Sequence, residues 1–183
     1  LYAFDRSTGA IVWRSAQALD GVRSAPALRS TRIVVSGENA WGFDTATGEL
    51  AWTQPTGIGS IGSDFDSAPA VRSDRVYIVG NGIFALDLLS GAILWSHEGG
   101  NIRSTPVIAG SVLIVNDSDS YSGREARPSH LVALDAAGNG DGTTTERWSW
   151  PVDRGDSSPI VVDGNVLFAS GNKLMLLGFP EQE

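Results

Sequence analysis

Cysteine is absent from this 183-residue sequence, and histidine occurs only twice. The absence of cysteine excludes disulfides, thiolate metal sites and cysteine nucleophiles within these residues. Two histidines, His97 and His130, give no basis for a catalytic triad, and we expect both to be surface or strand-edge residues. No run of apolar residues approaches the ~18 needed to cross a bilayer, so no membrane-spanning segment is predicted.

Positive charge and helical periodicity are also scarce. The sequence has 13 Lys and Arg against 21 Asp and Glu, which gives a net charge of −8. Because an acidic surface repels phosphate groups, nucleic acids and anionic membrane surfaces are unfavourable partners. Hydrophobic residues make up 42% of the chain, which is enough for a packed core. Hardly any stretch spaces them as a helix would.

A short element recurs along the chain with the pattern Ala-x-Asp-x-x-Thr-Gly-x-x-x-Trp, with single changes. Complete copies occupy residues 3–13, 42–52 and 85–95, and a stretched fourth copy runs from Ala133 to Trp148. The aspartates of successive copies are 39, 43 and 48 residues apart. A period near 40 residues, built from short strands, indicates β-propeller blades of four strands each.

A second signature, Ser-x-Pro, lies between these copies and starts at Ser24, Ser67, Ser104 and Ser157. Each occurrence is followed by a run rich in β-branched residues. Proline is tolerated where a strand begins, because its missing N–H is not needed for pairing there. We therefore expect each Ser-x-Pro to mark the first strand of a blade.

Each copy of the recurring element is predicted to form a strand, a tight turn and a second strand. The Asp carboxylate and the Thr or Ser hydroxyl can accept hydrogen bonds within the turn, and Gly takes the positive φ that the turn requires. The Trp is expected to pack against the neighbouring blade, in a structural role. The residues with these roles are Asp5, Gly9, Trp13, Asp44, Gly48, Trp52, Asp87, Gly91, Trp95, Asp135 and Trp148.

These patterns predict an all-β fold in which residues 1–183 form a single, partial β-propeller domain of four-stranded antiparallel blades. At the C-terminal end, Gly178 replaces the turn Asp, and no closing Trp precedes Glu183. We expect a strand from an N-terminal segment outside this sequence to complete the last blade, because an open sheet edge pairs readily with other molecules. The blades are expected at residues 1–15 (partial), 24–54, 67–97, 104–150 and 157–178 (incomplete).

The recurring element resembles the tryptophan-docking motif of the pyrroloquinoline-quinone-like (quinoprotein-like) β-propellers. The resemblance covers essentially the whole chain and implies the C-terminal portion of a seven- or eight-bladed ring. Because the family contains many secreted bacterial proteins, it also implies a periplasmic or extracellular location. The stretched copy, residues 135–148, resembles a variant common in the cofactor-free branch of the family, so no cofactor is predicted.

Quinone-dependent dehydrogenases of this family use a catalytic Asp, a calcium ion held by Glu, Asn and Asp, and usually a vicinal Cys pair. None of these groups maps onto a matching motif in this sequence, so no catalytic or cofactor-binding residue is assigned. The resemblance therefore favours a non-catalytic binding or scaffold propeller. Two alternatives stay open. One is a fragment of a quinone-dependent dehydrogenase whose cofactor site lies in other blades, and the other is an accessory domain of a larger secreted enzyme.

Blade four carries an insertion. The distance from the Ser-x-Pro proline to the turn Asp is 18 residues in blades two and three but 29 in blade four. The extra residues are polar, fall within 116–130, and include Tyr121, Arg124 and Arg127, which are residue types that anchor interfaces. Long loops on rigid scaffolds often bind partners, so we predict a protein or carbohydrate partner on this face. The alternative is a solvated loop.

The stretched turn of blade four partly resembles a calcium-binding loop. Oxygen-bearing side chains occupy loop positions one, five, seven and twelve, with a glycine at position six. However, position three is Ala137, and no flanking helices are predicted. Calcium is therefore a minor alternative to the prediction of no cofactor. The candidate ligands are Asp135, Asn139, Asp141 and Glu146.

Overall fold

The computed structural model describes residues 1–19, 21–55, 67–80, 82–100, 102, 104–117, 128–153 and 157–178. These parts of the chain form strands β1 to β17 and contain no helix, which confirms the prediction of an all-β fold. In this described part there is consequently no helix of a length and hydrophobicity that could cross a membrane.

The strands form separate antiparallel sheets in sequence order, three of them with four strands. Blade two contains β3 (Ala27–Arg29), β4 (Arg32–Ser36), β5 (Asn39–Asp44) and β6 (Leu50–Pro55). Blade three contains β7 (Ala70–Arg72), β8 (Arg75–Gly80), β9 (Gly82–Asp87) and β10 (Ile93–His97). Blade four contains β11 (Val107–Ala109), β12 (Val112–Asp117), β13 (His130–Asp135) and β14 (Glu146–Pro151).

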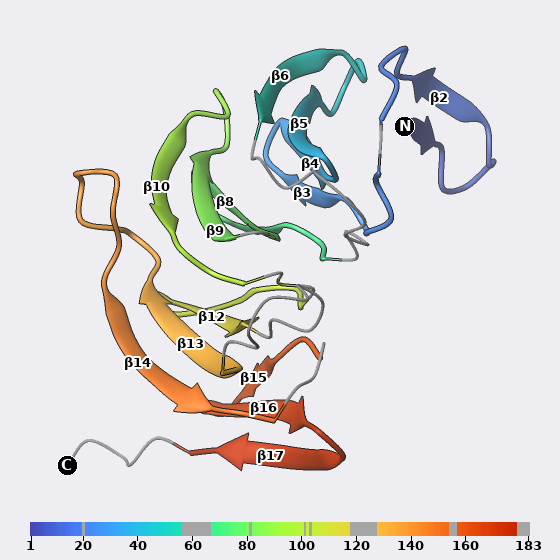
Figure 1. Ribbon diagram of the computed structural model, residues 1–183. Coiled ribbons are helices and arrows are strands. Elements are labelled where there is room, and N and C mark those ends of the chain that lie inside the picture. The colour runs from blue at the N-terminus through green and yellow to red at the C-terminus, as the bar shows by residue number, and fades with distance from the viewer. Residues whose placement is uncertain are drawn as a thin grey trace.

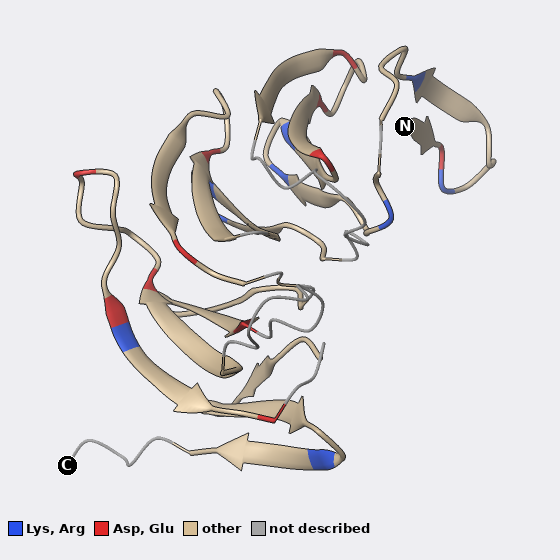
Figure 2. Cartoon of the chain, viewed as in Figure 1, with Lys and Arg blue, Asp and Glu red and all other residues tan. Residues whose placement is uncertain are grey.

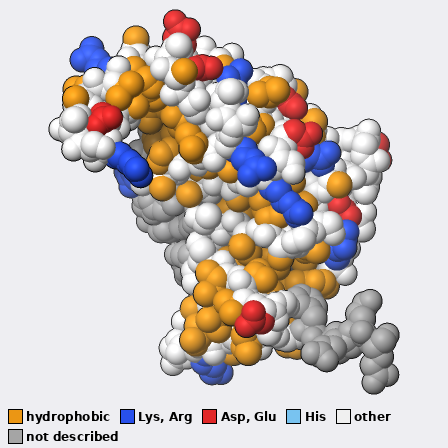
Figure 3. Space-filling view, turned by 180° about the vertical axis from the view of Figure 1, so that it is seen from behind, with side chains coloured by type: hydrophobic (Ala, Val, Ile, Leu, Met, Phe, Trp, Pro, Cys, Tyr) orange, Lys and Arg blue, Asp and Glu red, His pale blue; other side chains and the backbone are white. Residues whose placement is uncertain are grey.

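Smaller sheets flank these three blades. Blade one consists of β1 (Tyr2–Phe4) and β2 (Ile11–Arg14), and blade five of β15 (Ile160–Val162), β16 (Asn165–Ser170) and β17 (Lys173–Leu177). Strand β17 forms the edge of its sheet, and Leu174 and Leu176 on it are 72% and 64% exposed. Hydrophobic side chains are visible at the surface of this end of the chain (Figure 3). That another segment completes this sheet remains a prediction.

The sheets stand side by side in an arc, with the first strand of each blade on the inside (Figure 1). Strand β7 contacts both β3 and β11, and β11 contacts β15, so the innermost strands of successive blades touch. The last strands, β6, β10 and β14, lie on the outside of the arc (Figure 1). This is the blade arrangement of a β-propeller, as predicted. The described residues form an arc and not a closed ring.

The hydrophobic core lies between the blades. One cluster joins blades three and four, where Ile83 and Trp95 pack with Leu113 and Leu134. A second cluster joins blades two and three, and a third joins blades four and five. Because the sheets of blades three and four bury both faces against their neighbours, their middle strands are almost continuously apolar, with burial on successive residues.

The Ser-x-Pro signature holds the start of blades four and five to their second strands. Ser104 Oγ donates a hydrogen bond to Asn116 O (3.0 Å) and accepts one from Asn116 N (3.2 Å). Ser157 Oγ makes the same two bonds to Ala169. Proline has no N–H to pair with the second strand. The serine hydroxyl two residues earlier therefore extends the pairing beyond the strand, which begins directly after the proline.

Alternating strand direction gives the propeller two faces. The hairpin face carries the turns between first and second strands, at residues 30–31, 73–74 and 110–111, and the repeat turns that follow β5, β9 and β13. The linker face carries the connections between second and third strands and the links from one blade to the next. The strand ends joined by residues 118–129 therefore belong to the linker face.

Candidate functional site

The repeat turns are built around an aspartate whose Oδ1 accepts hydrogen bonds from groups two and three residues on. At Asp87 the donors are Leu89 N (3.2 Å), Ser90 N (2.8 Å) and Ser90 Oγ (2.7 Å). Asp5 and Asp44 accept the corresponding bonds in their own turns. Backbone bonds close each turn, for example Gly91 N to Asp87 O (2.9 Å).

These hydrogen bonds lower the pKa of the turn aspartates. The Ser90 hydroxyl is the main cause at Asp87, and at Asp135 it is the hydrogen bond from Arg147, whose Nη2 lies 2.6 Å from Oδ2. A carboxylate with a lowered pKa is a weak base. The turn aspartates are therefore ionised and hydrogen-bonded, and they are better suited to stabilising the turn than to transferring a proton.

The turns of blades two, three and four also receive the tryptophan of the preceding blade. The indole N–H donates to the carbonyl of the residue after the turn Asp in the next blade. The three bonds are Trp13 Nε1 to Thr45 O (3.0 Å), Trp52 Nε1 to Leu88 O (3.1 Å) and Trp95 Nε1 to Ala136 O (3.2 Å). Trp148 is half-buried and packs against hydrophobic residues of the cluster between blades four and five.

The turn glycine is required for two reasons. Gly91 has a φ of +75°, which side-chain-bearing residues rarely adopt. In addition, the ring of Trp52 lies directly over it, so that a Cβ at this position would lie 2.5 Å from Trp52 Cδ2. Gly48 and Gly138 lie in the same way under Trp13 and Trp95.

At the junction between blades three and four, three hydrogen-bond donors contact the same carbonyl oxygen. Ala136 O accepts hydrogen bonds from Tyr77 Oη (2.9 Å), Trp95 Nε1 (3.2 Å) and Arg75 Nη1 (3.2 Å). Arg75 Nη1 also donates to Ala137 O. Burial raises the pKa of the Tyr77 hydroxyl, so it acts as a neutral donor at this junction.

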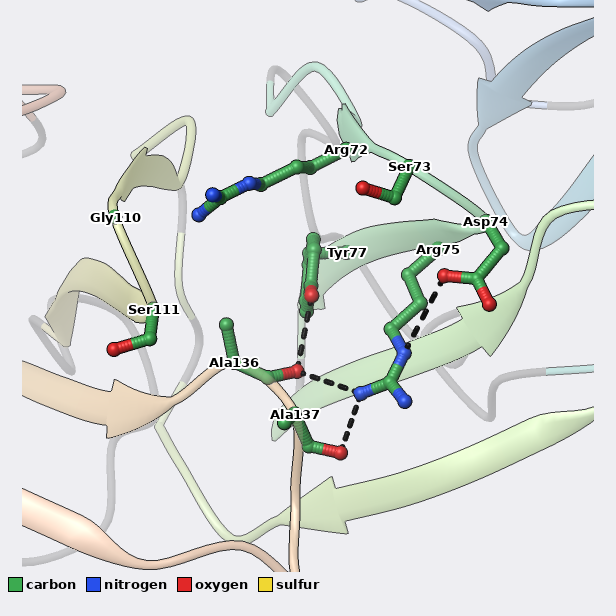
Figure 4. A pocket seen from close by; sticks show the side chains of 9 residues that line it. All are labelled: Arg72, Ser73, Asp74, Arg75, Tyr77, Gly110, Ser111, Ala136 and Ala137. Atoms are coloured by element: carbon green, nitrogen blue, oxygen red, sulfur yellow. Dashed lines mark hydrogen bonds and ion pairs between the residues drawn. The ribbon is translucent and has the colours of Figure 1, made fainter.

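A pocket of about 270 Å³ opens beside this junction on the hairpin face. Figure 4 shows the Arg72 side chain reaching over the pocket toward Gly110, while Arg75 and Tyr77 point to the Ala136 and Ala137 carbonyls. The lining residues are Arg72, Ser73, Asp74, Arg75, Tyr77, Gly110, Ser111, Ala136 and Ala137.

This pocket is not among the sites predicted from the sequence. One signal was present, because the turns at residues 29–32 and 72–75 share the pattern Arg-Ser-x-Arg. Ser30 and Ser73 have matching positive φ angles of 53° and 54°. The shared pattern shows a repeated turn, but only the fold places the stretched turn of blade four across from residues 72–75.

The predicted partner residues Tyr121, Arg124 and Arg127 lie outside the described residues. The strand end from which their segment starts is anchored. Asn116 Nδ2 donates to Ser157 O (3.2 Å), and Asp117 Oδ1 accepts from Gly100 N (2.9 Å). Both histidines are half-buried at strand ends, since His97 ends β10 and His130 begins β13.

Three of the four candidate calcium ligands, Asp135, Asn139 and Asp141, make side-chain hydrogen bonds within or beside the stretched turn. Asp141 Oδ1 accepts from Thr143 N (3.0 Å) and Thr143 Oγ1 (2.6 Å), and Asn139 Oδ1 accepts from Thr145 Oγ1 (2.9 Å). Within the described parts of the chain, no three His, Cys, Asp or Glu side chains gather as a metal site would require. Calcium binding by this turn remains the minor alternative, which titration can test.

Comparisons with known proteins identify related sequences and folds. The sequence model of the family described as outer membrane protein assembly factor BamB matches residues 1–178. No curated protein matches the sequence. Among solved structures, the fold is similar to BamB from Moraxella catarrhalis, with a TM-score of 0.75 and 18% identity over 96% of this chain. The match covers 54% of that structure, so this chain spans about half its length.

Two further structures show the same fold. The computationally designed protein Ika8 matches with a TM-score of 0.70 and 12% identity, over 97% of this chain and 52% of the designed chain. A quinohemoprotein alcohol dehydrogenase from Pseudomonas putida HK5 matches with a TM-score of 0.67 and 18% identity, over 88% of this chain and 30% of the enzyme. At these identities the likeness concerns fold and does not carry function.

Proposed function

The chain belongs to the family of the outer membrane protein assembly factor BamB, and from this premise we propose that it is a non-catalytic scaffold propeller that binds a protein partner. The observation that carries the proposal is the family match over residues 1–178, which covers every blade of the chain. The name of the family describes a factor in protein assembly at the outer membrane. By the same reasoning we place this protein on the periplasmic or extracellular side of the cell envelope.

The use of polar side chains supports a scaffold. Asp5, Asp44 and Asp87 each hold their own turn. Ser104 and Ser157 bond the second strands of their own blades, and Ser67 Oγ donates to Ser104 O of the next blade (3.1 Å). Hydrogen-bonding groups that satisfy one another within the fold make a rigid frame. Such a frame suits the presentation of loops to a partner.

We place the partner contact on the linker face, at the insertion of blade four. Asn116 and Asp117 fix the start of the segment to neighbouring backbone groups, and His130 pairs with Asp117 where the segment returns. A long connection that is anchored to a rigid sheet can form a binding surface without disturbing the rest of the fold. Tyr121, Arg124 and Arg127 supply the aromatic and guanidinium groups that anchor protein interfaces.

A photo-crosslinker at position 121 of the full-length protein tests this proposal, with the same group at exposed Ser30 on the hairpin face of blade two as the matched control. Irradiation in envelope extracts of the source organism should yield a discrete adduct from position 121 and none from position 30. The adduct should resist glycosidases, and mass spectrometry of its tryptic peptides should identify the partner protein. Equal labelling from both positions would refute the choice of face, and an adduct that only a glycosidase removes would show a carbohydrate partner.

A second candidate function is part of a quinone-dependent dehydrogenase, which the similarity to the quinohemoprotein alcohol dehydrogenase favours. The test is to add pyrroloquinoline quinone and calcium to the full-length protein and to measure dye reduction by alcohols and sugars. Turnover well above that of a heat-inactivated sample would overturn the scaffold proposal. An accessory domain of a larger secreted enzyme is the remaining alternative, which the full-length gene would reveal as a fused catalytic domain.

A further inference from the structure

Four basic residues gather at two neighbouring turns of the hairpin face, which also carries the aspartates of the repeat turns. Of the 13 Lys and Arg residues, Arg29, Arg32, Arg72 and Arg75 lie in just two turns, those that join β3 to β4 and β7 to β8. Figure 2 shows these positive charges on the inner strands of blades two and three. Clustered positive charge on a protein of net charge −8 creates a local site of attraction for anions.

The two turns use their arginines differently. In blade two, Arg32 Nη1 pairs with Asp44 Oδ2 across the sheet (3.4 Å). In blade three, Arg75 occupies the same register opposite Asp87 but turns away to the carbonyls of Ala136 and Ala137. That geometry brings its guanidinium into the pocket between blades three and four (Figure 4).

Donors remain available in this pocket. Within the described part of the chain, the Arg72 side chain makes no hydrogen bond or ion pair, and it reaches, exposed, over the pocket (Figure 4). The hydrogen bonds that Arg75 makes to described residues use Nη1, and its Nε lies 3.7 Å from Asp74 Oδ1, so Nη2 is free to donate. The Ser111 hydroxyl lines the opposite wall. Guanidinium groups that line a pocket without saturated partners are suited to bind an anion.

The charges select the kind of anion. Asp74 lines the same pocket with its side chain 75% exposed, so two positive charges share the pocket with one negative charge. A net charge near +1 suits a monoanion better than a doubly charged phosphate, because Asp74 repels the second charge. The planar guanidinium fork pairs well with a carboxylate, and the volume of about 270 Å³ has room for a short acidic side chain.

We propose that the pocket formed by Arg72, Arg75 and Ser111, between blades three and four, binds a carboxylate group. The carboxylate belongs to an acidic protein segment or to a free small carboxylic acid, which share the chemistry that the pocket recognises. The site lies on the hairpin face, opposite the insertion of blade four, and does not depend on the function proposed above. Both blades that build it have all four strands described.

NMR titration of the full-length protein tests the site, with the arginine Nε–Hε signals and the Ser111 amide as reporters. The probes are acetate, the capped peptide acetyl-Gly-Glu-Gly-amide and inorganic phosphate, at the same ionic strength and at a slightly alkaline pH where phosphate is mainly doubly charged. Saturable shifts confined to the pocket are expected with at least one carboxylate probe, and phosphate should bind more weakly. Preference for the peptide identifies a protein segment as the source, and preference for acetate identifies a free acid.

Arg72→Gln is the test variant, because Arg72 makes no bond within the described fold and its replacement should leave stability unchanged. The matched control is Arg29→Gln, which alters the equivalent position of the Arg-Ser-x-Arg turn in blade two, away from the pocket. Arg72→Gln should weaken carboxylate binding about tenfold, as expected for loss of a charged hydrogen-bond donor. Equal weakening by Arg29→Gln, unchanged binding in Arg72→Gln, or tighter binding of phosphate would overturn the proposal.

Discussion

The repeat turns of blades three and four differ in length but receive a tryptophan in the same way. In blade three, Trp95 follows Asp87 by eight residues, whereas in blade four Trp148 follows Asp135 by thirteen. In both turns the carbonyl after the aspartate accepts the indole N–H of the preceding blade. A glycine with positive φ lies under the incoming ring in both, although Gly138 comes one residue earlier than Gly91.

The part of the repeat that holds the blades together is the start of the turn, from the aspartate to the glycine. The extra residues of blade four fall after Gly138, so they lengthen the turn without moving the groups that accept Trp95. The longer turn also adds contacts, because Arg75 and Tyr77 of blade three reach the same carbonyl. Trp95 is accordingly 1% exposed, while Trp52 at the junction of blades two and three is 8% exposed.

The largest effect is expected from removing an indole. Trp95→Ala should reduce the free energy of unfolding by about 4 kcal/mol, because a buried aromatic side chain and its hydrogen bond are both lost. Trp52→Ala should cost somewhat less, and half-buried Trp148 the least of the three. Urea unfolding followed by circular dichroism measures the differences. A Trp148→Ala variant as unstable as Trp95→Ala would contradict the ranking.

Gly91→Ala should be the next most harmful change and should reduce the free energy of unfolding by about 2 kcal/mol. The alanine would have to adopt a positive φ, and its Cβ would also clash with the Trp52 ring. Gly9→Ala is the matched control. Gly9 has nearly the same φ, +71°, but nothing lies within 4 Å of a Cβ built there. The control isolates backbone strain, which is about 1 kcal/mol. Equal melting temperatures for the two variants would show that contact with the indole is unimportant.

Tyr77→Phe should destabilise the junction of blades three and four by about 1 kcal/mol, the usual net value of one buried hydrogen bond. The loss is limited because Ala136 O keeps its bonds from Trp95 and Arg75. Tyr2→Phe provides the control, since the Tyr2 side chain is 51% exposed. Thermal unfolding of the two variants should separate them, and an unchanged Tyr77→Phe protein would mean that the hydroxyl is dispensable.

Acid should weaken both turns by different routes. The pKa of Asp87 is lowered chiefly by the Ser90 hydroxyl and that of Asp135 chiefly by Arg147. A carboxyl with a lowered folded-state pKa stabilises above its unfolded pKa of about 3.9, and this stability is lost as pH falls through the folded value. Each exposed group should contribute no more than about 0.5 kcal/mol.

Unfolding in urea at about pH 6 and about pH 3 measures this loss. Ser90→Ala should reduce the pH dependence at any ionic strength. Arg147→Gln should reduce it mainly at low salt, because salt screens an exposed ion pair. A stability that rises on acidification would contradict the expected sign.

The smallest effect is expected from calcium, to which we predict no response. The carboxylate and amide oxygens of the stretched turn accept hydrogen bonds from their own loop, which calcium would have to displace. Titration with calcium chloride, followed by calorimetry and thermal unfolding, should show neither heat nor a shift. A saturable response that Asp141→Asn abolishes would establish the turn as a calcium site.

Much of the architecture could be predicted from the repeat alone. The recurring Asp, Gly and Trp residues and the Ser-x-Pro signatures indicated four-stranded blades, and the all-β fold and the family resemblance are confirmed. This succeeds because each signature acts within a few residues, where hydrogen bonds to the backbone depend on spacing along the chain. The ring size, the partner and the partner face remain predictions.

The tertiary structure determined which groups of the neighbouring blade each turn contacts. No pattern along the chain says that Arg75 turns from Asp87 toward Ala136, while its counterpart Arg32 stays with Asp44. That choice depends on the neighbouring blade, whose stretched turn presents carbonyls at the right distance. The sequence by itself determined the blades and their turns through local hydrogen bonding, whereas the pocket on the hairpin face exists only because two blades pack side by side.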